Sequence, residues 1–146
     1  MKFKNKIYLD YSDVLSMCHN LEDIASKLKP DLIVGIVRGG LLPALHLSHA
    51  LERPMETVTW QTRDETRQQF NGIVDNYIMS DNVVLFVDDI NDTGRTFKDL
   101  AKAYKTNTKK NVHFISLVEK TASDFHGTAA LTLDDPRWIV FPWEKD

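Results

Sequence analysis

The fold is decided by one stretch of the sequence, VVLFVDDINDTGRT at residues 83–96. Its first five residues are apolar, which is typical of a strand that is buried on both faces of a parallel sheet. Two adjacent carboxylates, Asp88 and Asp89, come directly after them. The stretch closes with TGRT at residues 93–96, and apolar residues then recur at helical spacing. These features predict a buried strand, an acidic turn and a helix, in that order.

The flanking sequence predicts further elements of the same kind. An amphipathic helix at residues 12–29, with Ser12 as its cap, precedes a continuous apolar strand at residues 32–37. A second helix is expected at 41–51, and further strands at 57–60, 112–118 and 138–141. Alternating strands and helices predict an α/β domain with a mainly parallel sheet flanked by helices. Ligands of such sheets bind beyond the carboxyl ends of the strands, where the turns after residues 37 and 87 would lie.

Residues 61–76 interrupt this alternation. The segment is rich in polar and charged residues, and Asn71-Gly72 within it is a strong turn or hairpin signal. We interpret the segment as a flexible lid, with plain disorder as the competing interpretation.

Composition limits the class of protein. The 146 residues suit one domain, and 42% of them are hydrophobic, as in an ordinary globular protein. The formal net charge of −3 argues against a nucleic-acid partner. The single cysteine excludes an internal disulfide, and the longest apolar runs are too short to span a membrane. We therefore expect a cytoplasmic protein with no membrane span.

The acidic turn and the helix after it offer two kinds of binding group side by side. Adjacent carboxylates after a buried strand are costly unless a cation or hydrogen-bond donors face them, and magnesium together with ligand hydroxyls would meet that need. The free amides, hydroxyls and glycine of residues 93–96 suit a phosphate group. An EF-hand starting at Asp89 would need a glutamate where Leu100 stands. A Walker loop needs Gly-Lys followed by Ser or Thr, which the sequence lacks.

Residues 84–96 closely resemble the phosphoribosyl pyrophosphate signature of type I phosphoribosyltransferases. Arg38-Gly39-Gly40 is similar to the pyrophosphate-binding loop of that family, and residues 60–77 are similar to its lid. The resemblance implies a single phosphoribosyltransferase domain over residues 1–146, with a lid at about 61–76 and a short C-terminal hood segment that recognises the base at about 119–146. It implies Mg²⁺ as the cofactor, and phosphoribosyl pyrophosphate and a nitrogenous base as substrates.

The resemblance also implies a role for each matching residue. Asp88 and Asp89 would hold the metal and the ribose hydroxyls, and which of the two touches the metal directly stays open. Asp92 would accept the proton of the base, and so complete a catalytic set with the acidic pair. The 5′-phosphate would be bound by the run that begins at the same residue, namely Asp92, Thr93, Gly94, Arg95 and Thr96, and the pyrophosphate by Arg38, Gly39 and Gly40.

The C-terminal part of the sequence is similar to the end of bacterial xanthine–guanine phosphoribosyltransferases. This similarity implies that Lys120 meets the exocyclic oxygen of the purine, that Trp138 stacks on its ring and that Ile139 belongs to the same base site. The expected activity is therefore transfer of the phosphoribosyl group to xanthine, guanine or hypoxanthine in nucleotide salvage. Two alternatives stay open: a phosphoribosyltransferase for adenine or a pyrimidine, and a regulator that senses phosphoribosyl pyrophosphate without catalysis.

Two further expectations concern partners and histidines. Members of the family assemble as dimers or tetramers, so the resemblance implies a homo-oligomer. His46 and His49 are spaced one helical turn apart and could bind a metal ion, but the sequence shows no nearby residue that would complete such a site. We therefore interpret them as ordinary surface or core residues.

Overall fold

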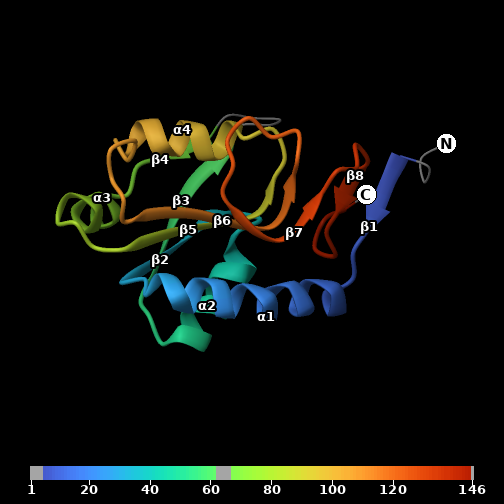
Figure 1. Cartoon of the computed structure of the whole chain (residues 1–146), viewed down its shortest axis with the longest axis horizontal. Helices are drawn as coiled ribbons and strands as arrows, with labels where there is room; N and C mark the ends of the chain where they lie inside the picture. The colour runs from blue at the N-terminus through green and yellow to red at the C-terminus, as the bar shows by residue number, and fades with distance from the viewer. Residues whose placement is uncertain (1–4, 62–66, 146) are drawn as a thin grey trace.

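The computed structural model describes residues 5–61 and 67–145. Over these residues the chain forms an α/β fold, in which a six-stranded sheet lies between α1 and α2 on one face and α3 and α4 on the other (Figure 1). In chain order the elements are β1 (Lys6–Tyr8), α1 (Tyr11–Leu28), β2 (Leu32–Val37), α2 (Leu41–Leu51), β3 (Met55–Gln61), β4 (Arg67–Gln69), α3 (Gly72–Met79), β5 (Val84–Asn91), α4 (Arg95–Ala103), β6 (Val112–Lys120), β7 (Thr128–Leu133) and β8 (Trp138–Val140).

The large sheet has the strand order β4-β3-β2-β5-β6-β7. All neighbouring pairs are parallel except β3 and β4, so the predicted mainly parallel sheet is confirmed. From β2 the chain continues to β3 on one side, whereas from β5 it continues to β6 on the other side. The strand order therefore reverses between β2 and β5. Such a reversal leaves a crevice at the carboxyl ends of the two strands.

The two central strands are buried on both faces, as their continuous apolar sequence predicts. Successive side chains of a strand point to opposite faces, and β5 shows this alternation clearly. Leu85 and Val87 join the core that α1 and α2 cover. Val84 and Phe86 join the core that α4 covers, where Phe97 packs. This packing on both faces holds the carboxyl end of β5 in place.

A second, two-stranded sheet joins the two ends of the described chain. Here β1 runs parallel to β8, with Ile7 opposite Ile139 (Figure 1). Ile139 and Phe141 are buried in the same core as α1, so this small sheet is packed onto the main body. It holds Trp138 close to the main sheet.

Several element bounds match the predictions, and two details near the N-terminus differ. The strand at 32–37 and the helix at 41–51 have the predicted bounds. The first helix, however, is capped by Asp10 and not by Ser12. The amide of Asp13 donates to Asp10 Oδ1 at 2.8 Å, and the amide of Asp10 donates to Asp13 Oδ2 at 2.9 Å. This reciprocal capping box satisfies amides that would otherwise be unpaired at the start of the helix.

The polar segment after Trp60 contains more regular structure than predicted. The third strand extends to Gln61, and β4 pairs antiparallel with it. Asn71-Gly72 is not a hairpin turn: Asn71 caps α3, and its Oδ1 accepts a hydrogen bond from the amide of Ile73 at 2.9 Å. The prediction was wrong here because asparagine favours turns and helix caps alike. Residues 62–66, the centre of the expected lid, lie outside the described residues.

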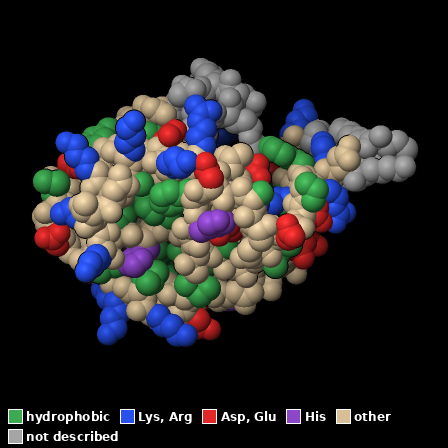
Figure 2. Space-filling model, turned by 45° about the horizontal axis from the view of Figure 1, so that its top comes forward, with side chains coloured by type: hydrophobic (Ala, Val, Ile, Leu, Met, Phe, Trp, Pro, Cys, Tyr) green, Lys and Arg blue, Asp and Glu red, His purple; other side chains and the backbone are tan. Residues whose placement is uncertain are grey.

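The described surface is chemically mixed. None of the helices in the described part of the chain is both long and apolar enough to cross a membrane. On the face that Figure 2 shows, basic, acidic and hydrophobic side chains are interspersed and do not form one charged patch.

Candidate active site

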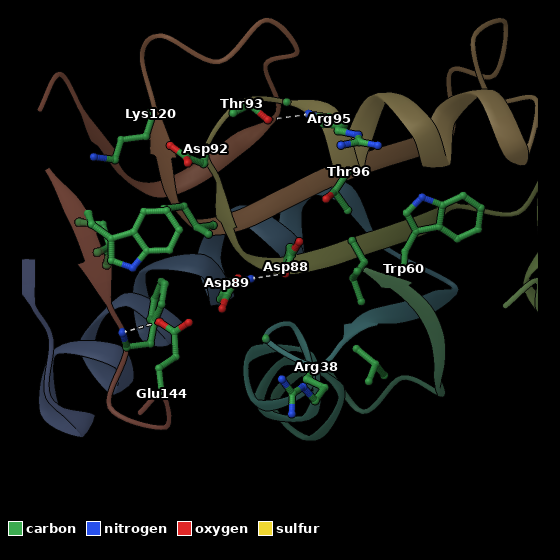
Figure 3. Close-up of a pocket in the computed structure, with 18 of the residues that line it drawn as sticks. Arg38, Trp60, Asp88, Asp89, Asp92, Thr93, Arg95, Thr96, Lys120 and Glu144 are labelled. Carbon is green, nitrogen blue, oxygen red and sulfur yellow. Dashed lines mark hydrogen bonds between the residues drawn. The ribbon is translucent and has the colours of Figure 1, made fainter. Parts of the chain in front are cut away.

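A cavity of about 770 Å³ lies at the carboxyl ends of β2, β5 and β6. It opens where the strand order of the sheet reverses, and the β8 segment forms another part of its wall (Figure 3). Of the residues that the sequence singled out, those that line it are Arg38, Gly39, Asp88, Asp89, Asp92, Thr93, Gly94, Arg95, Thr96, Lys120, Trp138 and Ile139. The fold therefore brings together four segments that are far apart in the sequence.

Gly40 is the one residue of the predicted site that the cavity lining does not include. Its amide donates to the carbonyl oxygen of Ile36 at 2.8 Å. A Cβ atom at this position would collide with the carbonyl oxygen of Val87. Gly40 therefore allows α2 to start directly beneath the end of β5, and its amide is used within the turn.

The acidic pair lies at the end of β5, and both side chains are partly buried. The amide of Asp89 donates to Asp88 Oδ1 at 2.8 Å, which orients the first carboxylate. Gly39 packs against the second carboxylate so closely that a Cβ atom there would collide with Asp89 Oδ2. The peptide bond that leads into this loop, between Val37 and Arg38, is cis. The loop after β2 and the acidic pair thus form one continuous surface.

The residues after the acidic pair form the start of α4. Gly94 is the N-cap residue, with φ 93, and it provides no side chain to cap the helix. The first turn itself contains no acidic residue. Thr93 Oγ1 accepts a hydrogen bond from the amide of Arg95 at 3.3 Å (Figure 3). Amides and hydroxyls at a helix start form a site suited to phosphate.

A loop after β6 packs against residues 93 and 94. A Cβ atom on Gly94 would lie 2.7 Å from the amide nitrogen of Phe125 and 2.8 Å from Ser123 Oγ. The amide of Asp124 donates to the carbonyl oxygen of Thr93 at 3.1 Å, and its carboxylate pairs with Lys98 of α4 at 2.8 Å. The 93–96 segment is therefore fixed to the 123–125 loop.

A buried polar network that sequence reasoning missed lies below this contact. Asn91 Nδ2 donates to Glu119 Oε1 at 2.7 Å and to the carbonyl oxygen of Phe125 at 2.6 Å. Glu119 is 5% exposed, and it also accepts from the amide of Gly127 at 2.8 Å. Ser123 Oγ donates to Asn91 Oδ1 at 3.2 Å. Buried polar groups need hydrogen-bond partners, and these residues supply one another with them. The resulting bonds join the end of β5 to the end of β6.

At the other end of the cavity, Lys120 and Trp138 lie on different strands. Lys120 is only 6% exposed, and its ammonium donates to the carbonyl oxygens of Asp135 and Arg137. Trp138 is 40% exposed and lines the cavity, whereas Ile139 is 4% exposed. The buried ammonium therefore shapes the loop that leads into the exposed indole.

Sequence reasoning also missed several lining residues, namely Trp60, Pro136, Arg137, Phe141 and Glu144. Glu144 Oε1 accepts from the amide of Phe141 at 2.9 Å, which closes the chain over this end of the cavity (Figure 3). Hydrogen bonds from Arg137 lower the pKa of Asp135 to about 2, so that carboxylate stays ionised beside the cavity. The resemblance placed them in the lid and in the C-terminal segment but gave none of them a role of its own.

Comparison with known proteins places this fold and site in a family. Residues 12–145 match the model of the phosphoribosyl transferase domain, so the chain belongs to that family and is a phosphoribosyltransferase. The resemblance noted in the sequence is thereby confirmed.

Three relatives illustrate the likeness. A xanthine-guanine phosphoribosyltransferase of Cereibacter sphaeroides is 29% identical over 118 residues, which cover 77% of this chain and 68% of that protein. The crystal structure of a purine phosphoribosyltransferase from Pyrococcus horikoshii Ot3 has a TM-score of 0.80 at 28% identity, and the match covers 97% of this chain and 96% of that chain. A xanthine-guanine-hypoxanthine phosphoribosyltransferase of Helicobacter pylori has a TM-score of 0.69 at 22% identity over 95% of this chain and 94% of that chain, which shows a shared fold.

Proposed function

We propose that this chain transfers the 5-phosphoribosyl group of phosphoribosyl pyrophosphate to a 6-oxopurine and releases pyrophosphate. The observation that carries the proposal is that one cavity is lined by the acidic pair, by the start of α4 and by Lys120 with Trp138. The names of the Cereibacter sphaeroides and Pyrococcus horikoshii relatives support a purine as the acceptor.

The donor would bind along the edge of the sheet. The start of α4 suits the 5′-phosphate, because its amides and hydroxyls are held in place by the 123–125 loop. Asp88 and Asp89 would accept hydrogen bonds from the ribose hydroxyls. Arg38 and the backbone of Gly39 would stabilise the negative charge of the departing pyrophosphate. Fixing both ends of the donor would position the C1 atom between them.

The carboxylates of Asp88 and Asp89 also fit a magnesium ion. They supply hard oxygen ligands that are half-buried next to the expected pyrophosphate loop, and Mg²⁺ binds proteins through one or two carboxylates together with phosphates. When bound, the ion would neutralise charge on the diphosphate.

The acceptor base would bind at the end that β8 closes. The Trp138 indole offers a flat apolar surface for a heterocycle, and the Ile139 backbone follows it along the wall of the cavity. The ammonium of Lys120 has three protons, of which two are used by the carbonyl oxygens of Asp135 and Arg137. The third would be left for an oxygen on the base, which favours a 6-oxopurine over adenine.

Asp92 would accept the proton that the base loses when its nitrogen bonds to C1. In Figure 3 this carboxylate lies toward the Lys120 end of the cavity, away from Arg38. The ribose carbon would gain oxocarbenium character as pyrophosphate leaves, as in glycoside hydrolysis, so a nearby carboxylate would also stabilise the developing positive charge.

A panel of bases tests this proposal. Purified protein would be assayed with labelled phosphoribosyl pyrophosphate, Mg²⁺ and xanthine, guanine, hypoxanthine, adenine, orotate or uracil. We expect the highest kcat/KM with one of the three 6-oxopurines. Preference for adenine or a pyrimidine would contradict the acceptor assignment. Calorimetric binding of the donor without turnover of any base would show a sensor and contradict transfer altogether.

Asp92→Asn tests the proton acceptor more directly. We expect kcat to fall by about 10²- to 10⁴-fold, the usual contribution of a positioned general base, while the affinity for the donor changes little. Asp81→Asn is a matched control, because Asp81 is exposed, lies outside the cavity and has φ 59, which asparagine tolerates. Equal kcat in the two variants would refute the role of Asp92.

The homodimer or tetramer that the resemblance implies stays a prediction. Light scattering of the purified chain would check it.

A further inference from the structure

A cluster of metal-binding side chains lies apart from the cavity, between α1 and α2. His19 and Glu22 are three residues apart on α1, so they share one face of that helix. His46 reaches them from α2, which packs against α1 on the same side of the sheet. The sequence did not reveal this cluster, because His46 is 24 residues away from Glu22. The sequence suggested a pair of His46 with His49, whereas the structure pairs His46 with residues of another helix.

The contacts within the cluster are short. His19 Nδ1 lies 2.6 Å from Glu22 Oε2, and His46 Nε2 lies 3.0 Å from the same oxygen. The two imidazole rings are nearly perpendicular, with centroids 5.3 Å apart. One ligand atom from each of the three residues lies within 4.8 Å of the others. Both imidazoles therefore direct a ring nitrogen to the same oxygen of the Glu22 carboxylate.

These three groups are a typical ligand set for a transition metal. Two imidazole nitrogens and one carboxylate oxygen suit Zn²⁺, which binds such ligands at about 2.0–2.2 Å in a tetrahedron. That geometry requires neighbouring ligand atoms to lie roughly 3.3 Å apart. The two nitrogen-to-oxygen distances, 2.6 and 3.0 Å, are somewhat shorter than this value, so the side chains would rotate apart slightly to admit an ion.

The cluster is open to solvent on one side. The His19 side chain is 62% exposed, whereas those of Glu22 and His46 are 32% and 22% exposed. An ion could therefore enter from solvent, and water could complete its coordination.

We propose that His19, Glu22 and His46 bind one Zn²⁺-class divalent transition-metal ion between α1 and α2. The site is distinct from the carboxylates at the end of β5, which would hold magnesium. Since α2 starts at Leu41, directly after the Arg38–Gly40 loop, the ion would also tie the helix behind that loop to α1. The ion would thus stabilise the packing of the two helices.

Zinc titration of the whole protein tests this site. Protein stripped with a chelator would be titrated with Zn²⁺ by calorimetry in excess Mg²⁺, and its melting temperature would be followed in parallel. We expect one tight equivalent of zinc and a raised melting temperature. Loss of a residue that supports a metal site costs about 10- to 100-fold in affinity, so loss of a direct ligand in His19→Gln or His46→Gln should weaken binding by at least about 100-fold.

Two controls make the outcome decisive. His49→Gln removes an exposed histidine from the same helix as His46 and should keep full zinc affinity. Asp88→Asn combined with Asp89→Asn removes the carboxylates of the candidate active site and should keep it as well. His19 is exposed, so His19→Gln is expected to fold even if His46→Gln does not. Absence of a tight equivalent in the wild type would overturn the proposal. So would zinc binding that survives His19→Gln, or that disappears only with the two aspartates.

Discussion

Gly94→Ala is the most informative single change in the candidate active site. Gly94 caps α4 with φ 93 and ψ −5, a backbone conformation that residues with a Cβ atom rarely adopt. It also lies against the loop after β6, where an added Cβ atom would be 2.7 Å from the Phe125 amide nitrogen and 2.7 Å from Asp124 Oδ1. Ordinary contacts of a Cβ atom are 3.4 Å or longer. The substitution therefore meets two independent obstacles.

The cost of each obstacle can be given an order of magnitude. Placing a non-glycine residue in the left-handed region costs about 1–2 kcal/mol. Overpacking against a backbone atom, which cannot rotate away, adds about 1–3 kcal/mol. The sum is about 2–5 kcal/mol, and a cost of about 3 kcal/mol within that range is equivalent to roughly 100-fold in an equilibrium constant. This free energy appears as lost stability if the loop stays in place, or as weaker binding of the donor phosphate if residues 93–96 shift.

Chemical denaturation and steady-state kinetics would measure both parts. Gly72→Ala is the matched control, because Gly72 has no atom within 4 Å of an added Cβ and occupies the first residue of α3. We expect Gly72→Ala to be neutral, or stabilising by up to about 1 kcal/mol. For Gly94→Ala the two losses together should reach about 3 kcal/mol, with KM for phosphoribosyl pyrophosphate raised more than KM for the base. Unfolding free energies and kinetics that are the same for both variants would refute the reasoning.

Three further predictions concern buried polar groups. Asn91→Leu should lower the free energy of unfolding by about 1–3 kcal/mol, measured by denaturant titration, because the buried Glu119 carboxylate loses the Asn91 donor and keeps that of the Gly127 amide; a loss below about 0.5 kcal/mol would contradict this. Lys120→Met should lower stability by about 2–3 kcal/mol and kcat/KM for the best purine, since two carbonyl oxygens lose a charged donor; unchanged values of both would contradict it. Burial raises the pKa of the Cys18 thiol to about 11, so at pH 8 the native protein should react with a thiol reagent only as fast as it unfolds. Rapid labelling of native protein would refute that burial.

Much of the fold could be read from local patterns. The strand Leu32–Val37 and the helix Leu41–Leu51 have their predicted bounds, because a doubly buried strand must be apolar throughout and a proline is tolerated in a first helical turn. Prediction failed where one residue type serves two local structures, as with Asn71, or where a strand is short or half-exposed. The strand Thr128–Leu133 is such a case, since it lies at the edge of the sheet and its side chains are only partly buried.

The candidate site, like the fold, was predictable from the sequence only in part. The acidic pair and the TGRT turn are contiguous in sequence, so their chemistry is visible without a structure. The network of Asn91 with Glu119, and the contact of the glycine cap with the 123–125 loop, join residues far apart in the chain. No local pattern encodes such a contact, because it exists only when neighbouring strands have paired.

The sequence by itself determined the α/β class, and it predicted the carboxylates proposed for a metal and the helix start proposed for a phosphate, because each depends on residues within one short segment. Only the tertiary structure decided that Lys120 and Trp138 line the same cavity as those carboxylates, and that His19, Glu22 and His46 meet between two helices. The physical reason is that parallel pairing and helix packing bring distant segments together at distances that the spacing along a chain does not specify.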